Sequence, residues 1–228
     1  MIKIKNLIIL YPSYERGGAT INLINFVNTC ALKDIKIHLI SNIKKKDKKN
    51  FVKKNIKFIN LNDKFDYKIL SRSITSIASI FLLLDLFKSI DSKNSLVVSF
   101  QSHILPIIFS RLFRRKIVIR NSENIIEATK YADYKFSASV IFLLKLFFYN
   151  FSNGIITNSN KAKKSLDVIT FKNKTKLIFN PYLKKVFSKN TAKRENLILS
   201  VGRLCKQKNQ SIAILAFANF LKKFPNYK

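Results

Sequence analysis

The sequence is poor in acidic residues, and this shortage is its most unusual property. Its 228 residues include 43 lysines and arginines but only 12 aspartates and glutamates, so the formal net charge is +31 at pH 7. A surplus this large favours contact with polyanions, which include phosphate-bearing substrates, nucleic acid and an anionic membrane face. Compositional drift explains the lysines equally well, because surface lysines are tolerated at nearly any position. The charge therefore narrows the range of partners without choosing between them.

Glycine, proline and cysteine are also scarce. With 4 glycines and 4 prolines, the chain is neither collagen-like nor of low complexity, and its 47% of hydrophobic residues are ample for a buried core. The two cysteines, Cys30 and Cys205, lie far apart and match no metal-binding or redox spacing. We therefore expect no bound metal. Two lone thiols suit a reducing compartment, which indicates the cytoplasm.

Long uninterrupted apolar runs are missing as well. The run at residues 7–10 is too short for the core of a signal peptide and is followed by no small-residue cleavage site. The stretches at residues 74–90 and 137–151 contain the charged residues Asp85 and Lys145, whereas a spanning helix needs about 20 mostly uncharged residues. These two stretches are predicted to be buried or surface-lying helices.

Short apolar runs alternate with helical segments along most of the chain. Strands are predicted at residues 4–10, 35–40, 56–61, 95–100, 116–120, 154–157, 176–179 and 196–201. Near-continuous apolar strands that alternate with helices are typical of an α/β fold with a parallel sheet covered on both faces. Ligands of such sheets bind beyond the carboxyl ends of the strands. We expect residues 17–18, 99–103 and 120–124 at that rim.

A polar, basic stretch predicts a domain boundary within residues 182–195. We expect a Rossmann-like domain over residues 1–182, a linker over residues 183–195 and the start of a second domain over residues 196–228. That last part supplies one strand and one helix, which cannot bury a core alone. It is therefore expected to pack on the first domain, to meet another chain, or to belong to something truncated.

Two local motifs are suited to binding an anion. Gly17 and Gly18 follow a strand and precede a helix, where glycine permits close backbone approach and the helix N-terminus offers free N–H groups. The pair does not match G-x-G-x-x-G, so a dinucleotide site is not supported. Arg203 and Lys208 flank the entry to a later helix, and a guanidinium with an ammonium suits a diphosphate. Taken alone, a plain tight turn and a solvated basic loop explain these motifs too.

The order of the segments resembles a known enzyme family. The chain carries, in order, GGAT, VVSF, KIVIRNSEN, GIITNSNKAKKSL, KLIFNPY and NLILSVGRLCKQKNQSIAILAF. The most specific segment has the pattern GRL-x-x-QK-x(5)-I-x-A-F. From its first strand to its last residue, the chain is similar to the group 1 (family 4) retaining glycosyltransferases, whose GT-B fold has two Rossmann-like domains.

The resemblance implies an enzyme that moves a sugar from a nucleotide-diphosphate sugar to a lipid-linked oligosaccharide or polysaccharide acceptor, with retention. It places the donor diphosphate on Arg203, Lys208, Gly17 and Gly18. Cationic and N–H donors that stabilise the departing nucleoside diphosphate make a metal or other cofactor unnecessary.

On the acceptor side, the resemblance points to the residues that follow the fourth and fifth strands. Many relatives carry a histidine just after the fourth strand; here the best-aligned position holds Gln101, and His103 lies two residues further on. Asn121 and Glu123 occupy a segment that faces the acceptor in some relatives. For His103 the start of a helix is the favoured explanation, and a polar helix cap explains Asn121 and Glu123 at least as well as contact with an acceptor. The resemblance identifies no catalytic residue.

The family's E-x7-E motif would lie beyond Lys228, and only one strand and one helix of the donor domain are expected. We therefore expect little activity from this chain alone, and a separate chain that completes the donor domain would restore it. The basic first domain would suit the anionic cytoplasmic face of a membrane, where each lysine or arginine is worth about 1 kcal/mol; liposome binding should then fall as salt rises.

Two other functions remain open. The chain could be a non-catalytic fragment or subunit that binds an acceptor and presents it to a partner. A nucleic-acid-binding protein is suggested by charge alone, but aromatic and basic residues are not interleaved as in any recognisable module. Lysines that cluster in loops such as residues 44–54 would give only nonspecific, salt-sensitive binding, so no specific nucleic-acid partner is expected.

Overall fold

The computed structural model describes residues 4–15, 17–52, 55–61, 72–171, 173–181, 195–202, 204 and 209–228. The chain divides into two compact units, Met1–Tyr182 and Leu183–Lys228. The assignment of the second unit to a donor domain stays a prediction.

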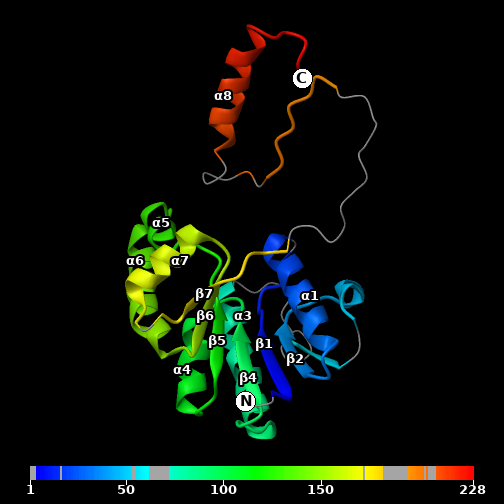
Figure 1. The fold of residues 1–228 in the computed structure, drawn as a ribbon, viewed down its shortest axis with the longest axis vertical. Coiled ribbons are helices and arrows are strands. Elements are labelled where there is room, and N and C mark those ends of the chain that lie inside the picture. Colours follow the sequence, from blue (N-terminus) through cyan, green and yellow to red (C-terminus); the bar gives the residue numbers. More distant parts are fainter. Residues whose placement is uncertain are drawn as a thin grey trace. The chain divides into compact units, whose positions relative to one another are not determined.

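A seven-stranded parallel sheet forms the centre of the first unit (Figure 1). Its spatial order is β3 (Ile56–Asn60), β2 (Lys36–Ser41), β1 (Asn6–Leu10), β4 (Ser95–Ser99), β5 (Ile117–Arg120), β6 (Gly154–Thr157) and β7 (Thr175–Leu177). In the register of the central strands, Ile8 of β1 lies between His38 of β2 and Val97 of β4. The chain adds strands first on one side of β1 and then on the other, so the point where the order reverses lies between β1 and β4. Ligand sites of open α/β sheets lie at such a point.

The central strands form because their side chains are apolar on both faces. Ile8, Ile9 and Leu10 are completely buried, as expected for a strand covered from two sides. Alternate residues enter two different cores: Ile8 and Leu10 belong to one cluster, whereas Leu7 and Ile9 belong to the other. This alternation fixes the register, because a slip of one residue would exchange the two sets.

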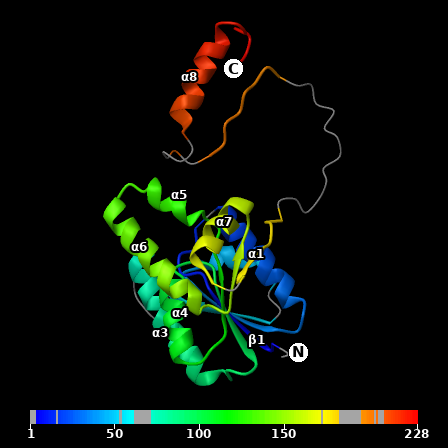
Figure 2. The ribbon, with the colours of Figure 1, turned by 60° about the vertical axis from the view of Figure 1, so that its left-hand side comes forward.

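The helices divide between the two faces of the sheet (Figure 2). They are α1 (Gly18–Ala31), η1 (Lys45–Asn50), α3 (Arg72–Ser89), α4 (Ile104–Leu112), α5 (Ile125–Lys130), α6 (Lys135–Phe148), η2 (Tyr149–Phe151) and α7 (Asn160–Ile169). Leu23 and Val27 of α1 pack in the cluster that contains Ile9. Side chains of α3, α4, α5 and α7 pack in the cluster that contains Ile8, on the other face.

The second unit contains α8 (Gln210–Leu221), in agreement with the predicted helix, but residues 196–201 form no strand. The predicted strand is therefore wrong as a regular element. The N–H of Lys228 donates to the carbonyl of Asn196, and the N–H of Ile198 donates to the carbonyl of Lys228, both at 2.9 Å. This is the hydrogen-bond pattern of a parallel pair at a single position. A strand needs a neighbouring strand of several residues to pair its backbone N–H and C=O groups. Within the described residues, Lys228 is the one residue that pairs with this segment in that way.

Candidate functional site

Loops that follow β1, β4 and β5 meet at the carboxyl edge of the sheet. The Gln101 side chain joins the first two: its Oε1 accepts from the Ser13 N–H at 3.0 Å, and its Nε2 donates to the Ser13 carbonyl at 3.2 Å. The Ser13 hydroxyl lies 3.2 Å from the Thr75 hydroxyl of α3. Gln101, predicted on the acceptor side, is therefore at the rim, where its amide holds two loops together.

His103 lies beside this bridge, and its hydrogen bonds define its tautomer. The Ser99 hydroxyl donates to the Gln101 carbonyl at 2.8 Å, and the Ser99 Oγ is 3.0 Å from the His103 Nδ1. Because a hydroxyl has one proton to donate, the Nδ1–H must donate to Ser99 and the lone pair stays on Nε2. Burial, followed by the positive charges of Lys145 and Arg120, lowers the pKa of His103 to about 3. The ring is therefore neutral at pH 7.

Asn121 and Glu123, the other two predicted rim residues, are tied to the end of α6. The Nδ2 of the buried Asn121 donates to the Glu123 carbonyl at 2.7 Å, and its Oδ1 accepts from the Tyr149 hydroxyl at 3.3 Å. The Glu123 carboxylate pairs with the Lys145 ammonium. Burial, and then the Glu123 charge, raise the pKa of the Tyr149 hydroxyl. Glu123, His103 and Lys145 thus form one electrostatic cluster.

The helix-cap alternative for Asn121 and Glu123 is wrong, because the neighbouring residue Asn124 caps α5. Asn124 is the N-cap of α5, and its side-chain oxygen accepts from the N–H groups of Ile126 and Glu127, both at 3.2 Å. His103, in contrast, is the N-cap residue of α4, so its plainer explanation as the start of a helix is correct for the backbone. Its ring still belongs to the polar cluster.

Sequence reasoning placed Arg120 in a rim segment without naming it as a site residue, and it missed Lys145 altogether. The Arg120 guanidinium stands 5.3 Å from the centre of the Phe100 ring and donates to the Asn180 side-chain carbonyl, and burial lowers its pKa. Lys145 carried the clearer signal, since it is the one charge in the apolar stretch of residues 137–151. A lone cation on an apolar helix face needs a partner, and Glu123 provides it.

A cavity of about 220 Å³ opens on the side of the sheet that carries α1. Its wall combines the exposed side of α1 with the ends of β4, β5 and β6 and the segment after β7. The residues that line it are Asn22, Asn25, Phe26, Thr29, Val98, Phe100, Arg120, Ile156, Ile178, Phe179, Asn180 and Pro181. Such a cavity fits a small apolar group with one polar atom near Arg120, and it is below the usual size of a whole ligand site.

The predicted phosphate-binding glycines stand at the start of α1. Both are described and exposed, and neither has a left-handed φ. Among the described atoms, nothing lies within 4 Å of a Cβ added at Gly17 or Gly18. The fold itself therefore does not need glycine here. The first turn of α1 contains no acidic residue, so no carboxylate there would repel an anion from the free N–H groups.

The other half of the predicted donor site, Arg203 and Lys208, lies outside the described residues, and its role stays a prediction. Within the described ranges, no three His, Cys, Asp or Glu side chains gather where a metal ion would bind. Among the helices that the structure describes, none combines the length and hydropathy that a membrane crossing requires.

No protein-family profile and no curated protein matches this sequence. Solved structures match by fold. The complex of HepE from Anabaena with UDP-glucose aligns with a TM-score of 0.51 at 13% identity, over 78% of this chain and 44% of that one. The HepE complex with UDP and glucose gives 0.52 at 14% identity, over 78% and 45%. UGT2 from Phytolacca americana, in complex with UDP-2fluoro-glucose and pterostilbene, gives 0.47 at 10%, over 68% and 47%, which is too distant to support an argument.

At these identities the similarity to HepE establishes a shared fold, and a fold alone does not determine an activity. The chain spans less than half the length of the HepE structures. The predicted fold class is confirmed: the chain has an α/β fold with the Rossmann-like parallel sheet of the GT-B type.

Proposed function

We propose that this chain functions in sugar transfer, as a group 1 (family 4) retaining glycosyltransferase. The donor would be a nucleotide-diphosphate sugar and the acceptor a lipid-linked oligosaccharide or a polysaccharide. The observation that supports this most is the GT-B-type sheet with a partly buried polar cluster at its carboxyl edge, which contains His103 and the Lys145–Glu123 pair. HepE, which shares the fold, was solved with UDP-glucose.

In this proposal the donor diphosphate is bound by the N-terminus of α1, which Gly17 and Gly18 open, and by Arg203 and Lys208. The N–H groups of the first turn of a helix, together with the helix dipole, favour an anion. Charge grows on the leaving diphosphate during transfer, and fixed donors that meet this charge lower the barrier without a metal or cofactor. The absence of a carboxylate from the first turn of α1 supports this assignment.

The acceptor would lie against the cluster of His103, Glu123 and Lys145. The lone pair on the His103 Nε2 is suited to accept a hydrogen bond from a sugar hydroxyl. With a pKa of about 3, however, the ring is too weak a base to hold that proton near neutral pH. We therefore assign His103 to positioning of the acceptor and leave the catalytic group unassigned.

The donor assignment is tested by calorimetric titration of the purified chain with UDP. Arg203→Ala and Lys208→Ala should each weaken binding about tenfold or more, because each removes a charge-assisted hydrogen bond. Lys206→Ala removes a charge from the same segment and serves as the matched control. Equal UDP affinity in all three variants would refute the assignment of Arg203 and Lys208 to the diphosphate site. Acceptor binding without UDP binding would favour the non-catalytic subunit.

A further inference from the structure

Helix α6 is mostly apolar and yet exposed. Every residue of α6 is described and none is buried, although its sequence is KFSASVIFLLKLFF. Phe136 is 85% exposed, Leu143 63% and Phe147 59%. A helix that is apolar on all sides is normally enclosed by other parts of a protein or by lipid. The outer side of α6 therefore lacks the cover that its composition calls for.

The exposed side chains form one continuous stripe. Phe136, Val140, Leu143 and Phe147 follow each other at intervals of four, three and four residues, which places them on one side of a helix. The opposite side faces the core, where Phe142 packs. Two exposed tyrosines, Tyr131 and Tyr134, lie in the segment between α5 and α6. We call the stripe and these tyrosines the α6 surface: Tyr131, Tyr134, Phe136, Val140, Leu143 and Phe147.

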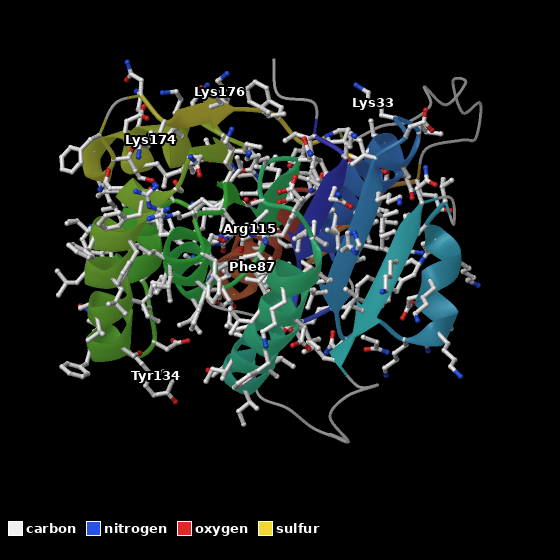
Figure 3. The ribbon with its side chains drawn as sticks, turned by 90° about the horizontal axis from the view of Figure 1, so that it is seen from below. Lys33, Phe87, Arg115, Tyr134, Lys174 and Lys176 are labelled. Atoms are coloured by element: carbon white, nitrogen blue, oxygen red, sulfur yellow. The ribbon has the colours of Figure 1, made fainter. Side chains whose placement is uncertain are left out.

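The position of α6 in the unit leaves this surface accessible. Figure 2 shows α6 at the outside of the first unit, with α4 on its inner side. In Figure 3 the Tyr134 side chain points away from the body of the unit. Monomeric proteins rarely expose apolar side chains in so continuous a patch unless the patch binds something.

The charges around the α6 surface indicate what would cover it. No charged residue lies between Phe136 and Leu144, and the Lys145 ammonium turns away to pair with Glu123. Lysines stand at the margin: the Lys130 ammonium lies 5.5 Å from the centre of the Tyr131 ring, and Lys135 begins the helix. Asp133 is the acidic group of the intervening loop. An apolar stripe with a basic margin, on a chain of charge +31, matches an anionic lipid surface.

Other ways of covering α6 fit less well. Two copies of the chain would bring two charges of +31 together, which opposes self-association at low salt. A membrane crossing would need about 20 residues, and α6 has 14. A short apolar helix with a basic margin lies flat at the level of the headgroups.

We propose that α6 docks the first unit on an anionic lipid bilayer, with the α6 surface inserted among the headgroups and upper acyl chains. The idea that this docking brings the protein to a lipid-linked acceptor rests on the proposed function. The contact between α6 and lipid does not depend on it. The Lys145–Glu123 pair connects this helix to the loop after β5, so the polar cluster of the rim would lie near the membrane surface.

A single tryptophan reports on this insertion, because the chain contains none. Phe136→Trp should show blue-shifted emission and quenching by brominated acyl chains in vesicles that contain phosphatidylglycerol, and the effect should weaken as salt rises. Leu32→Trp is the matched control: Leu32 is 74% exposed at the end of α1, on the other side of the sheet. No quenching at residue 136, or equal quenching at both positions, would overturn the proposal.

Removal of the apolar contacts provides the second measurement. Phe136→Ser and Leu143→Ser should each lower partitioning onto anionic vesicles about tenfold, since each removes one large inserted side chain. Ile21→Ser, which changes an exposed residue of α1, should leave partitioning onto anionic vesicles unchanged. Full partitioning of both α6 variants, or an α6-dependent dimer in sedimentation that binds no vesicles, would refute lipid docking. Vesicle binding needs no donor sugar, so failed sugar transfer with a water-soluble acceptor would count only against the proposed function.

Discussion

Acidification tests the polar cluster around His103, because the folded protein keeps this ring neutral. Burial is the main cause of its pKa of about 3, and the charges of Lys145 and Arg120 add to it. In the unfolded chain the ring titrates near 6.5. Between these two values the unfolded state binds a proton that the folded state does not bind. The unfolding free energy therefore carries the full contribution of the neutral His103 above about pH 6.5. It falls as the pH drops toward 3, because protons bind the unfolded state in preference.

The expected size follows from the interval between the two pKa values. Each pH unit of that interval corresponds to about 1.4 kcal/mol, so His103 contributes at most about 5 kcal/mol across the whole window. Typical domains have a total unfolding free energy of about 5–15 kcal/mol. Mild acid should therefore weaken this protein well before its carboxylates titrate.

Urea unfolding at a series of pH values measures this effect, with His103→Gln as the test variant. Glutamine stays neutral and keeps an N–H for Ser99, so the stability of the variant should fall less steeply below pH 6.5. The only other histidine, His38, also has a pKa lowered by burial and by Lys57 and Lys36, so His38→Gln should flatten the pH profile as well. Comparison of the two single variants with the double variant separates the two contributions. NMR of the two imidazoles gives the pKa values directly. A His103 ring that titrates near 6.5, or a His103→Gln variant as acid-sensitive as the parent, would refute the reasoning.

Two further predictions concern the rim. Gly18→Ala should leave the fold intact and stabilise it by up to about 1 kcal/mol, since alanine favours the helix and a Cβ there meets no described atom; UDP affinity should nevertheless fall if the diphosphate approaches this backbone. Thermal melts paired with calorimetric titration measure both, and unchanged UDP affinity would contradict the donor site. Lys145→Met should raise the pKa of His103, because it removes a nearby positive charge. It should cost less than about 1 kcal/mol of pairing energy, since Glu123 is half exposed. An NMR titration decides, and an unmoved His103 pKa would count against the cluster.

The sequence alone was sufficient for the strands of the first unit and for the residues at their ends. Runs such as residues 7–10 are apolar without interruption, and a parallel strand buried on both faces is the structure that such runs favour. Gln101, His103, Asn121 and Glu123 each lie within four residues of the end of β4 or β5, so a parallel sheet places all four at one edge. Their position required no knowledge of which strands are neighbours.

What these residues do at that edge was decided by the tertiary structure. Lys145 pairs with Glu123, 22 residues away, and Arg120 bonds Asn180, 60 residues away. The low pKa of His103 arises from burial and from these two cations together. From the sequence, the stretch of residues 137–151 could be either a buried or a surface-lying helix. In the structure α6 packs at the outside of the unit, so it is a surface-lying helix.

The same distinction explains why the strand predicted at residues 196–201 is absent. Apolar periodicity is read along the chain, whereas a strand exists only where another strand accepts and donates its backbone hydrogen bonds. Local pattern therefore determined which segments of this protein are apolar and where its polar side chains follow strands. The choice of partners depends on residues distant in the sequence, and only the assembled sheet and its helices decided it.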